Sequence, residues 1–190
     1  MADRDEPHEA HGPLEAHLAR LSLAEWLVLS LISEQPTYGL ALVELLSRDG
    51  RLGQVWWVAK AVVYRAIQRL DQLGLIRMTG EQRSSQGPAR SLLEATPAGR
   101  KLAEAWLSRP VEHTRDVRSE LLVKLALLDR AGADPRALLE AQLAQLRPTA
   151  AALEERLAAS TGFGYTLTLW RHEALSATIR FLETLTAQAS

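Results

Sequence analysis

The chain has 190 residues, of which 47% are hydrophobic and 24% charged, values typical of a globular protein of one or two small domains. It contains no cysteine, which excludes disulfides, thiolate metal sites and cysteine nucleophiles and fits a reducing compartment. The net charge of −1 is unevenly spread, because residues 1–36 sum to −5 whereas residues 37–106 carry ten basic and six acidic side chains. A basic middle segment is what a localised phosphate-binding surface produces.

Residues 1–20 begin with an acidic stretch that has no hydrophobic periodicity, so we predict a mobile or partly helical tail. His8 and His11 stand three residues apart in this tail, which does not make a metal site, and we predict neither a metal nor a cofactor. There is no signal-like apolar segment, and no apolar stretch is long enough to cross a bilayer. We therefore expect a cytoplasmic protein with no membrane partner.

Two helices are predicted after the tail. Ser22 caps the first, which is apolar on nearly every side over residues 23–32, as is typical of a central core helix, and Pro36 prevents its continuation. Thr37 is a plausible cap for the second helix, over residues 38–47.

A third helix is predicted over residues 59–73, after a short extended stretch at residues 55–58. Gly74 is a good C-terminal stop for it. One face of this helix carries apolar side chains at three- and four-residue spacing: Val63, Ala66, Ile67 and Leu70.

Two short strands are predicted next, over residues 75–79 and 91–95, joined by a polar loop rich in turn formers. Thr96 and Pro97 then open a helix that reaches about residue 107, with threonine as the cap and proline in the first turn. The predicted fold is therefore mainly α with a small two-stranded β wing.

Beyond a boundary at residues 108–110 the sequence predicts helices throughout. Asp134 and Pro135 start a helix with a coiled-coil-like leucine seam, which Pro148 should kink or split in two. A last helix over residues 166–187 carries two apolar stripes. We predict three parts: the tail at 1–20, a winged helix-turn-helix domain at 21–108, and an α-helical dimerisation domain at 111–190.

The order of three helices, a ribbon with a basic loop and a return helix is the plan of a winged helix-turn-helix, in which the third helix enters the major groove. Arginine can bind guanine through its planar fork and glutamine can pair with adenine, whereas residues in the first turn, on the flank or in the loop suit phosphates. A solvated amphipathic helix has the same polar face, and the element order is what favours DNA. The candidate DNA contacts are Lys60, Tyr64, Arg65, Gln68, Arg69, Arg83, Ser84, Gln86 and Arg90.

Several of these segments resemble the PadR-like transcription regulators, and the similarity spans about residues 21–185. It rests on residues 29–32 (LSLI), 36–39 (PTYG), 63–70 (VYRAIQRL), 73–76 (LGLI), 96–102 (TPAGRKL) and 118–124 (RSELLVK). The resemblance implies a homodimer joined largely through C-terminal helices, usually a repressor, often relieved by a small molecule.

Four tryptophans are candidates for contacts with a small-molecule effector, although their type favours packing in the core, between helices or between domains. The candidates are Trp56, Trp57, Trp106 and Trp170. No serine–histidine–carboxylate set and no glycine-rich phosphate cradle is evident, so we expect no enzyme. The leading hypothesis is a sequence-specific, DNA-binding repressor, and the alternative is a dimeric winged-helix adaptor that binds protein instead of DNA.

Overall fold

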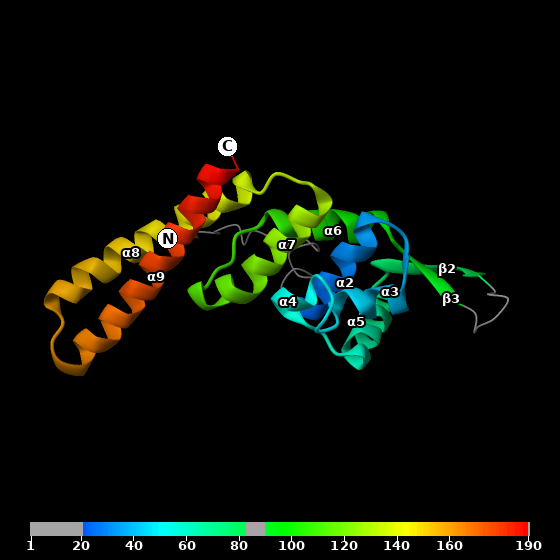
Figure 1. The fold of residues 1–190 in the computed structure, drawn as a ribbon, viewed down its shortest axis with the longest axis horizontal. Helices are drawn as coiled ribbons and strands as arrows, with labels where there is room; N and C mark the ends of the chain where they lie inside the picture. The colour runs from blue at the N-terminus through cyan, green and yellow to red at the C-terminus, as the bar shows by residue number, and fades with distance from the viewer. Residues whose placement is uncertain (1–20, 83–89, 190) are drawn as a thin grey trace, which may run out of the picture.

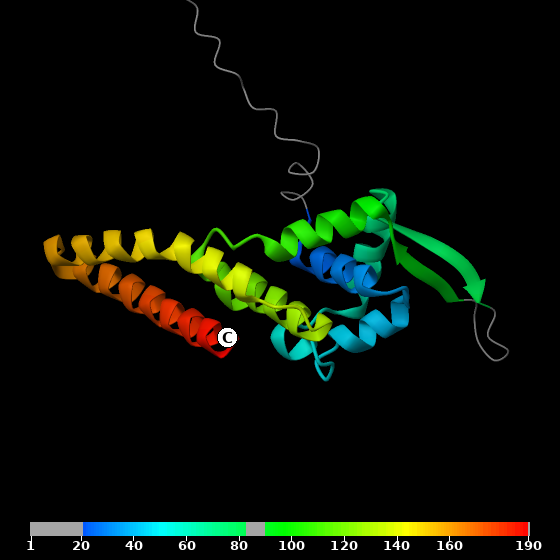
Figure 2. The same ribbon diagram turned by 90° about the horizontal axis from the view of Figure 1, so that it is seen from above.

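The computed structural model describes residues 21–82 and 90–189, which form a mostly helical molecule with one small sheet (Figure 1). The β2–β3 ribbon projects from one end, and the α8–α9 hairpin extends from the other (Figures 1 and 2). The elements are α2 (Leu23–Glu34), β1 (Thr37–Tyr38), α3 (Gly39–Leu46), α4 (Gly53–Trp56), α5 (Lys60–Gln72), β2 (Ile76–Gln82), β3 (Arg90–Ala95), α6 (Pro97–Ser108), η1 (Thr114–Asp116), η2 (Val117–Leu121), α7 (Leu122–Ala131), α8 (Arg136–Ala159) and α9 (Gly162–Gln188).

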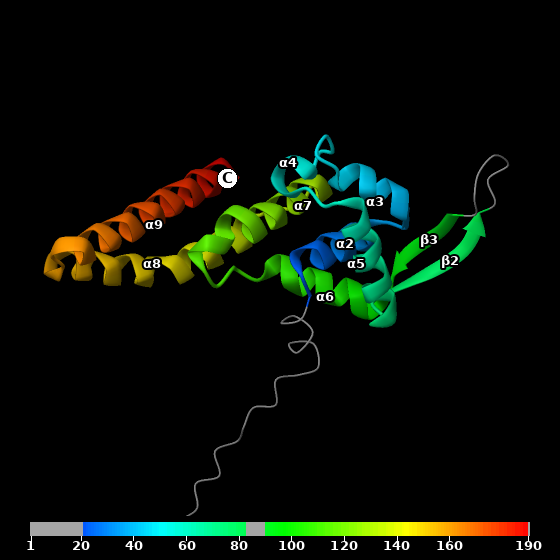
Figure 3. The same ribbon diagram turned by 90° about the horizontal axis from the view of Figure 1, so that it is seen from below.

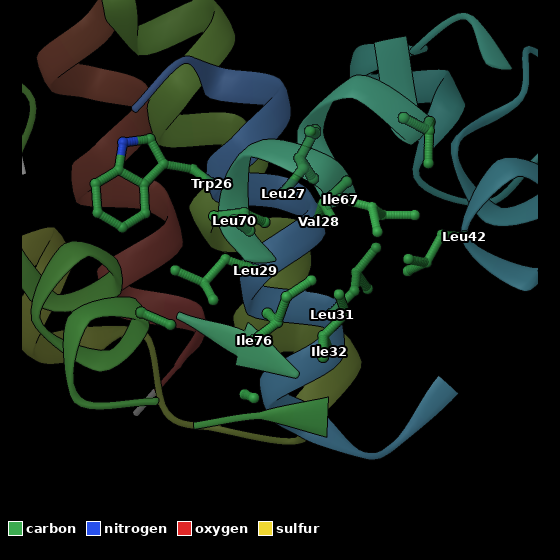
Figure 4. Close-up of a cluster of buried hydrophobic side chains, with 14 of the residues drawn as sticks. Trp26, Leu27, Val28, Leu29, Leu31, Ile32, Leu42, Ile67, Leu70 and Ile76 are labelled. Carbon is green, nitrogen blue, oxygen red and sulfur yellow. The ribbon is translucent and has the colours of Figure 1, made fainter. Parts of the chain in front are cut away.

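Helix α2 is the centre of the winged-helix part, as its sequence predicts. Ser22 and Glu25 form a reciprocal capping box, in which the Ser22 hydroxyl accepts from the Glu25 N–H and the Glu25 carboxylate accepts from the Ser22 N–H. Every residue from Trp26 to Ile32 is buried. Figure 4 shows these side chains meeting Leu42 of α3, Ile67 and Leu70 of α5, and Ile76 of β2.

The predicted two-stranded wing is present as β2 and β3, and a third strand that was not predicted, β1, extends the sheet in the order β1-β3-β2. Thr37 and Tyr38, predicted as a helix cap and the first helical residue, instead pair with Leu93 and Leu92 of β3. That prediction was wrong because it used local signals alone, whereas pairing with β3 satisfies the backbone of these two residues.

The segment predicted as extended at residues 55–58 is extended only in its second half, because Gly53–Trp56 forms the short helix α4 and Trp57 then has extended backbone. Leu52 and Gly53 are buried here, and a Cβ on Gly53 would lie 1.6 Å from the carbonyl oxygen of Ser47. This close approach to the end of α3 is open only to glycine, and it turns the chain where the sequence pattern suggests a straight stretch.

The predicted end of α5 and the predicted start of α6 are both confirmed. Gly74 follows α5 with a φ of +67°, the left-handed conformation that glycine adopts readily. The Thr96 hydroxyl accepts from the Gly99 N–H at 3.1 Å, and Pro97 occupies the first turn of α6.

The C-terminal helices α8 and α9 form an antiparallel hairpin (Figures 1 and 3). Helix α8 runs unbroken through Pro148, so of the two predicted outcomes, a kink or a split, the split is wrong. Helix α9 begins at Gly162, four residues earlier than predicted. Of its two apolar stripes, only the one that contains Leu175 and Leu182 is buried.

Two clusters of buried side chains lie in the molecule, and α7 is attached to the first of them. Val123 and Leu127 of this helix pack with the winged-helix core, whereas Leu121, just before it, packs in the C-terminal cluster. Over residues 21–82 and 90–189, no helix is long and apolar enough to cross a membrane, and no group of three or more histidine, aspartate or glutamate residues could hold a metal ion.

Candidate nucleic-acid interface

The polar face of α5 lies on a helix that is anchored firmly to the core. Val63, Ala66, Ile67 and Leu70 are all buried, and α5 packs against α2 and α3. The opposite side of the helix is open to solvent. It carries the predicted contact residues Lys60, Tyr64, Arg65, Gln68 and Arg69, all of them exposed. A helix fixed along one face can hold the donors of its other face at defined positions.

The first turn of α5 adds a positive end to this surface. Ala59 is the N-cap and supplies no side-chain hydrogen bond, and the first turn contains no acidic residue. The early N–H groups of a helix lack helical partners and favour nearby anions. Lys60, exposed in this turn, places its ammonium at the same end.

Tyr64 connects α5 to the start of α3. A Cβ on Gly39 would lie 3.0 Å from Tyr64 Cε1, so the tyrosine ring packs closely over this glycine. The Tyr64 side chain nevertheless stays 40% exposed, and Leu40, the next residue of α3, is 41% exposed. The two helices therefore share one continuous surface.

Arg65 and Arg69 lie one turn apart and line a shallow hollow of about 370 Å³ beside the start of α2, together with Ser22 and Glu25. Within the described part of the chain, neither arginine has an ion-pair partner. Both guanidinium groups are therefore available to an external anion. Gln68 lies in the same exposed face but does not line this hollow.

The wing is the β2–β3 ribbon, which extends well beyond the helices (Figure 3). Its register changes between Thr79 and Glu81, and the backbone of Arg90 lies opposite Gln82 near the tip. The predicted loop contacts Arg83, Ser84 and Gln86 lie outside the described residues.

Arg77 is a basic wing residue that the sequence analysis did not single out. Its Nε and Nη2 donate to the same oxygen of Glu94, at 3.1 and 2.8 Å, directly across the two strands. This pairing occupies its guanidinium and ties the base of the ribbon together. A charged pair at opposing strand positions is a signal that a register prediction could have used.

The four tryptophans considered for effector binding lie in different environments. Trp56 and Trp57 are 40% and 48% exposed, and the guanidinium carbon of Arg48 lies 4.3 Å from the centre of the Trp57 ring. Trp170 is 68% exposed on α9. Trp106, by contrast, is buried and stacks on Trp26 with ring centres 5.1 Å apart. No described ring contact joins one candidate to another.

Trp106 belongs instead to a polar network where α6 leads into the C-terminal helices. Its indole N–H donates to Glu120 Oε1 at 2.9 Å, and the buried Lys124 Nζ lies 2.7 Å from the same oxygen. Lys124 also donates to the backbone carbonyl of Arg109 at 2.7 Å, and its Nζ lies 4.8 Å from the Trp106 ring centre.

Burial lowers the pKa of Lys124 from its ordinary value, against the opposing influence of Glu120. Sequence reasoning missed this network. The only available signal is a lysine at position 124 within the otherwise apolar run of residues 121–128.

Comparison with known proteins gives a family match within the winged-helix part. Residues 28–105 match the Transcriptional regulator PadR-like family, and no curated protein sequence matches the chain. Among solved structures, Bacillus subtilis PadR in complex with operator DNA is 18% identical and has a TM-score of 0.46, with 89% of this chain and 100% of that chain covered. The same protein in complex with p-coumaric acid is 19% identical, with a TM-score of 0.39 and coverage of 95% and 98%.

Proposed function

We propose that this chain, whose residues 28–105 belong to the PadR-like family of transcription regulators, is a homodimeric, cytoplasmic repressor. It binds a specific DNA operator and releases it when a small molecule binds. The observation that carries the proposal is the polar face of α5, in which Arg65, Gln68 and Arg69 are exposed on a helix anchored to the core. Residues 21–108 form the DNA-binding domain in this scheme, and residues 111–190 form the dimerisation domain.

The free stripe of α9 supports dimerisation. Phe163, Leu167, Trp170 and Phe181 are exposed by 80%, 38%, 68% and 40%, and they stand on one side of a helix whose other apolar side is covered by α8. Apolar side chains at alternating steps of four and three residues pair with a second helix of the same kind. A second copy of this chain presents the same stripe, so a two-fold contact covers both.

This dimer can be tested by sedimentation of the full chain at micromolar concentration. Trp170→Glu places a carboxylate in the stripe and should shift the protein to the monomer mass of 21.0 kDa. Arg180→Glu, on an exposed part of the same helix, is the matched control and should remain dimeric. A wild-type chain that sediments as a monomer would contradict the proposal.

DNA binding can be tested by fluorescence anisotropy with a duplex from the gene's own upstream region, with scrambled duplexes for comparison. Gln68→Ala should reduce discrimination between the duplexes by about 1–3 kcal/mol, because an amide that pairs with a base edge carries sequence information. Arg69→Ala should weaken binding to every duplex and make the salt dependence shallower, because a phosphate contact carries none. Arg156→Ala removes one exposed charge from α8 and should change neither quantity.

The same titration decides between the repressor and the protein-binding adaptor. An adaptor would bind no upstream duplex more tightly than a scrambled one at any salt concentration. A selective protein whose preference is unchanged in Gln68→Ala but altered in the wing variant Arg83→Ala would reverse the roles proposed for helix and wing.

A further inference from the structure

The hollow beside Arg65 and Arg69 combines two unpaired cations with an apolar lining. It lies where the start of α2 meets α5, two helices that pack side by side (Figure 3), and its apolar lining residues are Ala24, Val62 and Ala66. Both arginines are exposed, and neither has an ion-pair partner within residues 21–82 and 90–189. Because a guanidinium group binds carboxylates and phosphates with the same fork of donors, either anion can occupy this hollow.

One carboxylate also lines the hollow, and the start of α2 already engages it. An oxygen of Glu25 accepts from the backbone N–H of Ser22 at 2.6 Å and from the Ser22 hydroxyl at 2.8 Å. This carboxylate forms no ion pair with Arg65 or Arg69. The hollow therefore has two positive charges against one negative charge and favours a further anion.

The chain carries such anions directly beside the hollow. Residues 1–20, which we call the acidic tail, lie outside the described part of the chain and join it at Leu21, next to the lining residue Ser22. The acidic tail has five acidic and two basic residues and sums to −3, whereas residues 37–106 sum to +4. Four of its carboxylates stand close together in the sequence, at Asp3, Asp5, Glu6 and Glu9.

The acidic tail is long enough for these carboxylates to reach the hollow. Asp3 and Glu9 stand 18 and 12 residues before Leu21. An extended chain of 18 residues spans about 60 Å, and the hollow begins at the residue after Leu21. Covalent attachment over a short stretch of chain gives an effective concentration of about 1 mM, so even a weak contact is populated.

We propose that the acidic tail docks in this hollow and competes with DNA for Arg65 and Arg69. Its carboxylates take the place of DNA phosphates on the two guanidinium groups. The proposal rests on the proposed function, because the two arginines belong to the surface proposed to bind DNA. Any duplex displaces the same contact, so the acidic tail lowers the affinity for every sequence by one factor and leaves discrimination unchanged. An effective concentration of about 1 mM and a dissociation constant of about 0.5 mM make this factor about three.

The contact itself can be measured without DNA, by paramagnetic broadening of amide resonances in the full chain. The chain contains no cysteine, so Ala2→Cys provides a single thiol for a nitroxide label. The label should broaden the amides of Arg65 and Arg69 more than that of Arg156 on α8. The excess should disappear in the amide variant of the acidic tail, which combines Asp3→Asn, Asp5→Asn, Glu6→Gln and Glu9→Gln. It should also disappear in Arg65→Gln/Arg69→Gln, and equal broadening in all three proteins would overturn the proposal.

The effect on DNA is measured with the anisotropy titration. The amide variant should bind the upstream duplex and the scrambled duplexes at least about threefold more tightly than the wild type, with the same ratio between them. In an Arg65→Ala/Arg69→Ala background the same amide substitutions should change affinity less than about 1.5-fold, because the hollow no longer holds the acidic tail.

A matched variant separates docking from the effect of net charge. Four exposed carboxylates of the described chain, none of them in an ion pair, are replaced in the combination Glu44→Gln, Asp49→Asn, Glu104→Gln and Asp129→Asn. This control removes as many aspartates and glutamates as the amide variant and should raise DNA affinity less than about 1.5-fold at about 0.15 M salt, where distant charges are screened. An increase as large as that of the amide variant would assign the effect to net charge and overturn the proposal.

Failure of the docking and failure of the proposed function give different results. If the chain binds DNA and the label broadens no amide of α5 in excess, the docking is wrong and the repressor stands. If the chain binds no duplex, the proposed function fails, and the amide broadening still decides whether the acidic tail occupies the hollow.

Discussion

Replacing Lys124 by methionine removes one charge from the junction between the winged-helix part and the C-terminal helices, and it keeps most of the side-chain volume. The variant loses the hydrogen bond to the Arg109 carbonyl, the ion pair with Glu120 and the contact with the Trp106 ring. These three contacts connect the end of α6, the linker and α7. The substitution therefore measures how strongly the network holds the two parts together.

The expected cost follows from what each partner retains. Truncating one member of a fully buried ion pair costs about 3–5 kcal/mol. The Glu120 side chain is 33% exposed, however, and it keeps its hydrogen bond from Trp106, so water replaces part of what it loses. The Arg109 carbonyl loses a charged donor, which costs about 1–3 kcal/mol, and the variant no longer buries an ammonium group. We expect a net destabilisation of about 1–2 kcal/mol at neutral pH.

The pH dependence has a definite sign. Burial, the largest influence, lowers the pKa of Lys124 in the folded protein, whereas in the unfolded chain the pKa stays near the ordinary value of 10.5. Between these two values the unfolded chain binds more protons, so the free energy of unfolding of the wild type rises with pH. Lys124→Met lacks this titration. The difference in stability between wild type and variant should therefore widen as the pH is raised from neutral toward about 10.

Urea unfolding followed by circular dichroism, at one protein concentration and several pH values, measures both effects. Lys101→Met is the control, because Lys101 is an exposed lysine of α6 and its replacement should change stability by less than about 0.5 kcal/mol at any of these pH values. A difference that narrows as the pH rises would show that Glu120 outweighs burial and raises the pKa of Lys124. If Lys124→Met had the same free energy of unfolding as the wild type, the contacts of Lys124 would contribute nothing to stability.

Three further substitutions test the winged-helix part. Gly99→Ala should destabilise the protein by about 2 kcal/mol or more in thermal unfolding, because the new Cβ would lie 2.0 Å from the Leu75 carbonyl oxygen, and the neighbouring Ala98→Ser should not. Thr96→Ala removes the cap of α6 and should cost about 1–2 kcal/mol; an unchanged melting temperature would contradict a capping role. Arg77→Ala breaks an ion pair whose arginine is 65% exposed, so it should cost less than about 1 kcal/mol.

The features that the sequence predicted well are those set by neighbouring residues. The Ser22 cap, the Thr96 cap with Pro97, and the stop at Gly74 each depend on groups within a turn or two of chain. The buried face of α5 depends on helical periodicity alone. In all of these the local geometry and the final packing require the same residue, so the pattern is sufficient.

The features that it missed depend on contacts between distant segments. Strand β1 exists because Thr37 meets Leu93, 56 residues later in the numbering. Lys124 is buried with its ammonium hydrogen-bonded to the carbonyl of Arg109, which lies 15 residues earlier in the chain. Local propensity carries no information about which distant backbone or charge will be present.

The two apolar stripes of α9 show what a sequence pattern can and cannot predict about function. Both stripes are evident from the periodicity of the sequence. Periodicity does not, however, distinguish a stripe that packs against a helix of the same chain from one that stays exposed. In the structure α8 covers Leu175 and Leu182 and leaves Phe163 and Trp170 exposed. The first pair therefore belongs to the fold of one chain, and the second pair is the one that we propose for the dimer contact. The same distinction separates the tryptophans, since Trp106 holds the junction from inside whereas Trp170 is available for contact. Residue type alone does not show whether a candidate side chain is buried in the fold or exposed for binding. The structure supplies this information, and the candidate can then be tested.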